Sequence, residues 1–440
     1  MQRIQVEFYS CAARPFSGGR RSVLACGLAF VALIVAPALP AATADTRPLP
    51  LLEAVRLADA EAPAISARRA AVESANDAIT PAGALPDPQL VAGIENLPVN
   101  GSDAFSLTND FMTMRKIGVM QEIPGGNKRQ LRTERAQAAA AREQALLTNE
   151  RLSVRESVAR AWITRSTAER RLELLKTLQP RAAAEVTAAV AALSSGRGSA
   201  ADGIAAKAAQ AMLADRISQV EREVADARSD FARWLPEAAE RPLGDAPNWA
   251  ELGVNPDSLV GNVAHHRELL AYDAMEQMAN TEVALARAEK RPDWSVEFDY
   301  AQRGPQYSNM ISLEFRVGLP LFAGSRQDPT IASKQAAVAQ IEAEREDARR
   351  MHTAELRKVV TAWRSASDRV DRYEHELLPL ADDRAEATLA AYRGGRGDLQ
   401  ASLTALDQVI EQRIAYTELQ NTLGQAWAAL HFAFSQERQP

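Results

Sequence analysis

The stretch "WSVEFDY" (294–300) differs from the sequence around it. Large apolar residues alternate in it with Ser295, Glu297 and Asp299, and this period of two predicts a β-strand with one apolar and one polar face. Most of the remaining chain is rich in Ala, Glu, Arg and Gln, which favour helices. The sequence therefore predicts a mainly helical protein with a few amphipathic strands whose edges need partners.

Composition and motifs exclude several functions. The chain has 440 residues and a net charge of −6, and no strongly basic segment indicates binding to nucleic acid. It has no phosphate-binding loop, no His and Glu pair at zinc spacing and no recognisable Ser/His/Asp arrangement. We therefore expect no enzyme activity and no cofactor.

The N-terminus has the features of a secretion signal. Arg20 and Arg21 precede the apolar run "VLACGLAFVALIVAPALPA" (23–41), which ends in small residues. We predict cleavage after Ala44, so that residues 1–44 are a signal peptide; a retained membrane anchor is the alternative. No later segment has about 18 continuous apolar residues.

Both cysteines, Cys11 and Cys26, lie in this leader. A lipidated cysteine ends such an apolar run, whereas this run continues well past Cys26. The mature protein is therefore expected to contain no disulfide and no thiolate metal site.

The mature sequence repeats itself after about 200 residues. Three segments recur in the same order: 81–96 as 286–300, 118–129 as 316–326, and 193–202 as 392–401. Pro86 and Pro292 differ by 206 positions, Pro124 and Pro320 by 196, and Gly196 and Gly395 by 199, so only small insertions separate the copies. A repeat of this length predicts a duplicated domain.

Each half is predicted to have the same order of elements, in which a helix and two strands lead into a long helical hairpin. The first helices are expected over about 50–80 and 257–289, and the strand pairs over 88–97 with 112–123 and 294–301 with 310–321. The predicted organisation is a first repeat (45–240), an irregular linker (241–256), a second repeat (257–434) and a C-terminal tail (435–440).

The first strand pair is followed by a very long predicted helix, from about 128 to 194, which would span roughly 100 Å. Pro180 and its counterpart Pro379 predict matching kinks or breaks. A Gly-Arg-Gly turn and a returning helix (199–234, 399–434) complete each hairpin. Apolar residues at heptad spacing predict coiled-coil packing: Leu147, Val154, Ala161, Ala168, Leu175, then Leu356, Trp363, Val370, Leu377, with Val359, Ala366, Tyr373 and Leu380.

Strands of this length cross a bilayer when tilted, and Trp294, Tyr300 and Tyr307 would suit its interfaces. The alternative is a small soluble sheet packed on the helices. Four strands do not close a barrel, and an open edge in lipid leaves unpaired backbone groups. We therefore expect several copies to share one barrel; three copies would supply twelve strands and surround a hollow helical tunnel.

These features, in this order and duplicated, resemble the TolC-like outer-membrane efflux proteins over about 50–434. Further marks are "LPDPQL" and "RPDWSV" before each first strand and "GLPLFAGSR" after the last. Segment 96–129 is similar to the heavy-metal efflux branch of CzcC and CusC.

The resemblance implies a homotrimer whose protomers each contribute four strands to a shared barrel in the outer membrane and long helices to a periplasmic tunnel. It further implies the exit duct of a proton-driven tripartite pump, with a periplasmic membrane-fusion adaptor and an inner-membrane RND-type transporter, exporting heavy-metal cations. The same architecture serves drug efflux or type I protein secretion. A periplasmic adaptor or coiled-coil scaffold is the less favoured alternative.

The resemblance also implies site residues at the helical returns. Adaptor hairpins are expected to contact them, and the candidates are Gly196, Arg197, Gly198, Gly395, Arg396 and Gly397. The alternative is that the glycines only permit a positive φ at a helix end.

Asp202 fits the family position for a carboxylate gate at the tunnel tip, with Asp398 nearby as a further candidate. Its alternative role is that of an ordinary carboxylate in a first helical turn.

Metal binding by the chain itself is not expected. Met112, Met114 and Met120 are thioethers, but Met112 and Met114 would share one strand face and meet lipid. His265 and His266 are adjacent on an expected helix and therefore point in different directions.

Overall fold

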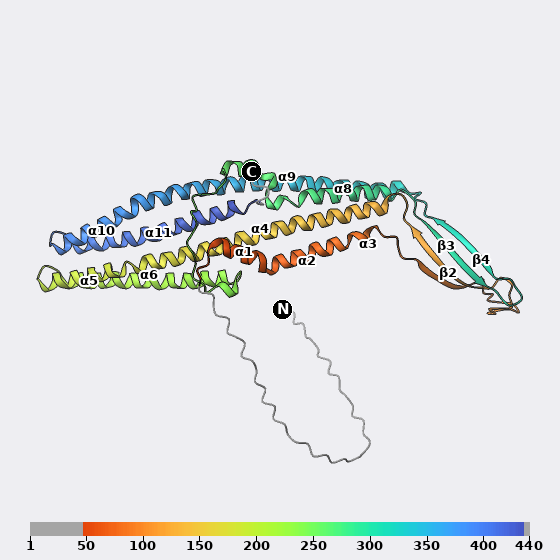
Figure 1. Cartoon of the computed structure of the whole chain (residues 1–440), viewed down its shortest axis with the longest axis horizontal. Helices are drawn as coiled ribbons and strands as arrows, with labels where there is room; N and C mark the ends of the chain where they lie inside the picture. The colour runs from red at the N-terminus through yellow and green to blue at the C-terminus, as the bar shows by residue number, and fades with distance from the viewer. Residues whose placement is uncertain (1–46, 435–440) are drawn as a thin grey trace, which may run out of the picture. The chain divides into compact units, whose positions relative to one another are not determined.

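The computed structural model describes residues 47–434, so the predicted signal peptide (1–44) and tail (435–440) lie outside the described residues. Residues 47–434 form one unit, in which long helices lead into a four-stranded sheet (Figure 1). The mainly helical fold with four strands is confirmed. No helix in the described part of the chain is long and apolar enough to cross a membrane.

The first half begins with three helices where one was expected over 50–80. Pro63 starts the second of them, and the residue before it, Ala62, is extended at φ −60° and ψ 124°, as a residue before proline prefers. The elements of this half are α1 Leu51–Glu61, α2 Pro63–Asp77, α3 Ile79–Gly83, β1 Gln89–Glu95, β2 Met114–Ile123, α4 Lys128–Lys176, α5 Gln179–Ser194 and α6 Ala200–Ala232.

The second half departs from the expected helix over 257–289, which is continuous only from Tyr272. His266 is extended there because it forms a β-bridge with Phe434, and Arg267 N–H donates to the carbonyl of Ala433. The elements are η1 Pro236–Ala238, α7 Pro256–Gly261, η2 Val263–His265, η3 Arg267–Leu269, α8 Tyr272–Ala288, β3 Trp294–Gln302, β4 Met310–Val317, η4 Ala323–Ser325, α9 Gln327–Arg372, the π-helical turn η5 Tyr373–Leu377, α10 Leu378–Arg393 and α11 Leu399–His431.

The two prolines of the long helices produce different irregularities. The chain breaks between α4 and α5, and Pro180 lies in the first turn of α5, where a missing N–H costs nothing. Before Pro379, in contrast, the wide π-helical turn η5 carries α9 into α10 without a break.

The helices form a layer with two free edges (Figure 1). Near the sheet, α4 packs against α2 and α3 on one side and α8 on the other, and α8 also packs against α9. Toward the helical returns, α4 and α5 pack against α6, and α11 lies between α4 and α9. The first-half heptad residues Leu147, Val154 and Leu175 are buried in this layer. Leu380 on α10 is 65% exposed.

The predicted linker over 241–256 is irregular, yet it is packed into the core. The Trp249 ring contacts the Trp162 ring at 6.3 Å and the Trp427 ring at 5.2 Å, edge to face. Trp363 Nε1–H donates to the Trp249 carbonyl and Trp427 Nε1–H to the Glu251 carbonyl, both at 2.9 Å. Helices of the second repeat therefore hold this segment through its backbone, and Trp162 of α4 packs against its Trp249 ring.

The strands form one antiparallel sheet in the order β1-β2-β3-β4, so β2 and β3 join the two repeats. An ion-pair cluster lies at this junction, where β3 begins and α4 begins. The Lys128 ammonium, 1% exposed, lies 2.9 Å from both Asp293 oxygens and 3.0 Å from Glu289 Oε2, and Gly125 N–H donates to Asp293 Oδ1. Burial lowers the pKa of Lys128, but the hydrogen bonds to the two carboxylates outweigh it and leave the pKa raised.

Replacing Asp293 with alanine tests this cluster. Asp293→Ala leaves the buried Lys128 ammonium with Glu289 alone, and the lost charged hydrogen bonds should cost about 1–3 kcal/mol of unfolding free energy. Thermal unfolding followed by circular dichroism measures the loss. Asp226→Ala, which removes an exposed ion pair with Arg222, is the matched control and should change stability by no more than about 0.5 kcal/mol. Equal effects of the two substitutions would contradict a structural role for the cluster.

Candidate functional site

One face of the sheet is mainly apolar across all four strands, and the polar residues that share it are Arg115, Gln121 and Gln302. The register places Val119 opposite Phe298, and Phe298 opposite Leu313, so the apolar residues of successive strands lie side by side. Leu90 is 73% exposed and Ile311 is 69% exposed. An apolar surface of this continuity marks an interaction site. Its members are Leu90, Ala92, Ile94, Ile117, Val119, Trp294, Val296, Phe298, Tyr300, Ile311, Leu313, Phe315 and Val317.

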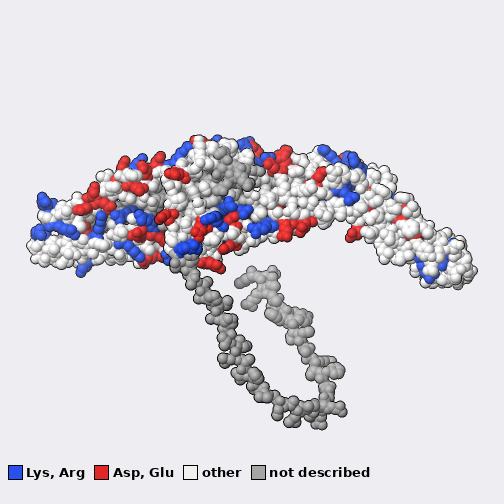
Figure 2. Space-filling model, viewed as in Figure 1, with Lys and Arg blue, Asp and Glu red and all other residues white. Residues whose placement is uncertain are grey.

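The opposite face is polar. Lys116 Nζ lies 2.9 Å from Glu297 Oε1 and 3.6 Å from Asp299 Oδ1, and Gly118 leaves room for Asp299, because a Cβ there would be 2.6 Å from the Asp299 Cβ. Five carboxylates against two cations give this face a net charge of −3; they are Glu95, Glu122, Glu297, Asp299 and Glu314, with Lys116 and Arg316. The alternation in 294–300 predicts one polar and one apolar face. The net charge of the polar face, however, can be counted only once the register of all four strands is known. Figure 2 shows few charged residues over the strands in its view and many along the helices.

Two of the three predicted interface aromatics lie on the apolar face. Trp294 begins β3 and Tyr300 lies two residues before its end, and each is 41% exposed. Tyr307 instead lies in the β3–β4 loop, where its hydroxyl donates to the Asn109 carbonyl at 3.4 Å and Arg303 lies over its ring.

The expectation that Met112 and Met114 share a lipid-facing strand surface is wrong. Met112 precedes β2, and Met114 and Met120 lie on the polar face, opposite Glu95 and Glu297. The sequence pattern left this open because the alternation of β2 is weak, and only its register with β3 assigns the faces.

The helical returns have the geometry of glycine-terminated helices. Gly196 and Gly395 have φ of +73° and +71°, a region that disfavours side chains. Arg197 N–H donates to the Ala192 carbonyl and Arg396 N–H to the Ala391 carbonyl, both at 2.9 Å, which closes the last turn of α5 and of α10.

The structure brings the two returns together. A Cβ on Gly395 would lie 2.8 Å from Arg197 Nη1, so the first return contacts the second through this side chain. Gly198 and Gly397 permit close backbone approach, because a Cβ there would lie 3.0 Å from the Ala192 Cβ and 3.2 Å from the Ala391 Cβ. Arg396 is exposed beside them.

Both gate candidates cap helices. Asp202 accepts from Ser199 N–H at 2.7 Å while its own N–H donates to Ser199 Oγ at 3.2 Å, a capping box at the start of α6. Asp398 accepts from Ala401 N–H at 2.7 Å at the start of α11. Both carboxylates therefore have a structural partner at the tip.

A buried carboxylate near the tip was missed by the sequence reasoning. Glu185 on α5 is 3% exposed, and its Oε1 accepts from Ser402 Oγ on α11 at 2.7 Å. Burial raises its pKa, whereas Ser402 and Arg393 act in the opposite direction. No motif distinguishes Glu185 from the many exposed glutamates of these helices; only the α5–α11 packing buries it.

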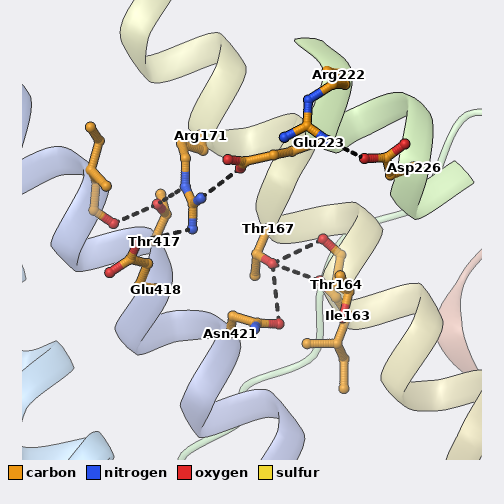
Figure 3. A network of polar contacts seen from close by, with 11 residues as sticks. Ile163, Thr164, Thr167, Arg171, Arg222, Glu223, Asp226, Thr417, Glu418 and Asn421 are labelled. Carbon is orange, nitrogen blue, oxygen red and sulfur yellow. Dashed lines mark hydrogen bonds and ion pairs between the residues drawn. The ribbon is translucent and has the colours of Figure 1, made fainter. Parts of the chain in front are cut away.

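A polar network joins the two hairpins in the middle of the helical layer. Arg171 on α4 donates to Glu223 Oε2 on α6 and to Thr417 Oγ1 on α11, both at 2.9 Å (Figure 3). Figure 3 also shows Thr167 directed toward Asn421 of α11. Arg171 therefore ties the first hairpin to the second.

Of the two adjacent histidines, His265 is exposed and His266 is buried. The His266 ring is buried and stacks on His352 at 4.5 Å, and burial, with His352 and Arg267 nearby, lowers the pKa of His266 to about 3. His352 Nε2 lies 2.9 Å from Glu268 Oε2. Among residues 47–434, no group of three or more His, Cys, Asp or Glu side chains is arranged to hold a metal ion.

Comparison with solved structures identifies the fold. The chain is similar to CusC, whose structures describe transmembrane channel formation, with a TM-score of 0.72 and 14% identity over 88% of this chain and 92% of that chain. It is similar to the outer membrane protein VceC of Vibrio cholerae (TM-score 0.72, 17% identity, 87% and 95% covered) and to the CmeC outer membrane channel of Campylobacter jejuni (0.73, 13%, 88% and 87%). No protein-family model and no curated protein matches the sequence. The chain has the fold of these outer-membrane channels.

Replacing Glu185 with glutamine should stabilise the protein increasingly as the pH rises. Because the folded pKa of Glu185 is raised, its protonated form is favoured in the fold, and that contribution is lost as the pH rises through the folded pKa. Glutamine does not ionise, so Glu185→Gln should exceed the wild type in unfolding free energy at pH 8, and the difference should shrink at pH 4.5. Unfolding free energies at pH 4.5 and 8 measure the gain. Asp226→Asn on exposed α6 is the control; the same pH dependence in both variants would contradict the assignment.

Proposed function

We propose that three copies of this chain share one β-barrel in the outer membrane and form the exit duct of a tripartite, proton-driven efflux pump. The observation that carries the proposal is the continuous apolar face of a four-stranded sheet with two open edges, attached to long helical hairpins. The fold shared with outer-membrane channels supports it.

A membrane accounts for the apolar face. The nine residues of β3 span about 30 Å, and a tilt near 40° reduces this to about 23 Å, close to the ~25 Å apolar band of outer-membrane barrels. Trp294 at the start of β3 and Tyr300 near its end suit the interfaces. The polar face then lines the interior, as in other aqueous barrels.

The number of strands requires more than one copy. An open sheet edge in lipid leaves N–H and C=O groups unpaired at several kcal/mol each. Four strands are fewer than the eight of the smallest single-chain barrels, whereas three copies of the sheet supply twelve. The same ring gives the free edges of the helical layer partners and encloses a tunnel.

The interior charge supports a cationic cargo. A net charge of −3 on the polar face of one copy becomes −9 in a trimer, and rings of carboxylates favour cations in a pore. We propose heavy-metal cations as cargo, which pass without a dedicated ligand site. Drug efflux and type I protein secretion use the same duct architecture and remain outcomes of the export test.

The helical returns are the proposed docking site of a periplasmic membrane-fusion adaptor, which joins the duct to an inner-membrane RND-type transporter. Gly196, Arg197 and Gly198 lie beside the second return, so adaptor hairpins would meet both returns at once. Arg197 and Arg396 supply exposed positive charge there. Asp202 and Asp398 are the proposed gate carboxylates, in addition to their capping role.

Fractionation and export test the duct. The processed protein should require detergent for extraction from outer membranes and should have the mass of a trimer by light scattering. A deletion strain should lose resistance to heavy-metal cations, and the wild-type gene should restore it. A freely soluble monomer would contradict the proposal; loss of drug or protein export with unchanged metal resistance would reassign the cargo.

Charge reversal at the returns tests adaptor docking. Arg197→Glu combined with Arg396→Glu should leave the trimer intact and reduce export at least tenfold, because both changes lie at the proposed contact. The matched control is Arg222→Glu on exposed α6, which should export as the wild type does. Full export by the double variant would show that adaptor docking does not depend on Arg197 and Arg396.

A further inference from the structure

We propose that edge strand β4 of one copy pairs with edge strand β1 of the next in one fixed register, with Phe315 opposite Ala92, and that Arg326 and Asp87 close this seam below the sheet. The inference rests on the proposed shared barrel and specifies how its copies join. It follows from the duplication, because the seam inside the chain, between β2 and β3, has a counterpart between copies.

The sequence repeat holds at the level of strand register. Strand β3 corresponds to β1 at the offset of 206 positions that separates Pro86 from Pro292. Strand β4 corresponds to β2 at the offset of 196 that separates Pro124 from Pro320. These offsets convert the observed pair Leu90–Val119 into Val296–Phe315, which the structure contains. The two hairpins are therefore copies in register as well as in sequence.

The same offsets convert the internal seam into the seam between copies. The observed pair Val119–Phe298 becomes Phe315 of one copy opposite Ala92 of the next. By the same rule Ile117–Tyr300 becomes Leu313 opposite Ile94, and Gln121–Val296 becomes Val317 opposite Leu90. All six residues lie on the apolar face, so this register continues that face across the junction. A slip of one residue would place polar side chains against lipid.

The ion-pair cluster has a counterpart as well. Lys128 follows Gly126-Asn127 at the start of α4, and Arg326 follows Gly324-Ser325 at the start of α9. Its partner Asp293 follows Pro292 directly before β3, just as Asp87 follows Pro86 before β1. Within the described residues 47–434, neither Asp87 nor Arg326 forms a side-chain ion pair, and both are exposed. In the ring each would meet the other across the seam.

Exposed apolar residues lie at the same place. The stretch from Pro320 to Arg326 is two residues longer than its first-half counterpart from Pro124 to Lys128. In and beside it Leu319 is 68% exposed, Leu321 76% and Phe322 70%. Leu85, directly before Pro86, is 43% exposed. A second copy seated at this edge would cover these side chains, and the adjoining open edges of β4 and β1 identify that occupant as the same chain.

Cysteine pairs test the register. Directly opposite residues of antiparallel strands have Cα atoms about 4.5 or 5.5 Å apart, and both distances permit a disulfide. In a background with Cys11→Ser and Cys26→Ser, the double variant Ala92→Cys with Phe315→Cys should form covalent trimers on mild oxidation, resolved by non-reducing denaturing electrophoresis. The matched controls Ala92→Cys with Glu314→Cys and Ala92→Cys with Arg316→Cys represent one-residue slips and should stay uncrosslinked.

The possible outcomes distinguish failure of the proposed β4–β1 register from failure of the proposed trimer. Crosslinking of a control pair in place of Ala92 with Phe315 would overturn the register, and a trimer by light scattering without any crosslink would overturn the seam while the duct stands. A monomer would overturn both.

Exchanging the two charges tests the proposed ion pair between Asp87 and Arg326. Asp87→Arg and Arg326→Asp should each lower the temperature at which the trimer dissociates, and the double variant should recover at least half of the loss. A double variant no more stable than the weaker single variant would refute the Asp87–Arg326 contact.

Discussion

The backbone groups on the outer edges of β1 and β4 are the constraint on which the rest of the structure depends. An antiparallel sheet of four strands has two edges, and in the proposed membrane setting lipid would exclude the water that otherwise satisfies their N–H and C=O groups. The polar face, the helical layer with its free edges and the exposed residues around Leu321 all make sense once further copies supply the missing strands. The proposed shared barrel therefore requires further copies of the chain to complete the sheet.

Because the chain is duplicated, the residues that join its two repeats have counterparts at the outer edges of the sheet. The Lys128–Asp293 cluster joins the repeats within the chain. Among the described residues 47–434, Asp87 and Arg326 at the corresponding positions of the other half form no side-chain ion pair. The repeats are nevertheless unequal in detail, because Pro180 follows a helix break and Pro379 follows a π-helical turn.

The helical part depends on the buried segment between the repeats. Its backbone accepts hydrogen bonds from the indoles of Trp363 and Trp427, and its own Trp249 packs between two others. Composition alone predicted an irregular linker there, since proline and glycine mark turns but do not indicate burial. Likewise the helix expected over 257–289 failed at His266, where a long-range bridge to Phe434 overrides local propensity.

The sequence by itself determined the duplication, the four strands, the long hairpins and the glycines of the returns. These depend on local periodicity and on residues such as Gly196 whose φ is positive, so they are encoded within a few positions. Only the tertiary structure decided which strand face carries Met114 and Met120, that Glu185 is buried, and which partners hold Asp202 and Lys128. Those properties arise from register and packing between segments far apart in the chain, and local patterns carry no record of distant neighbours.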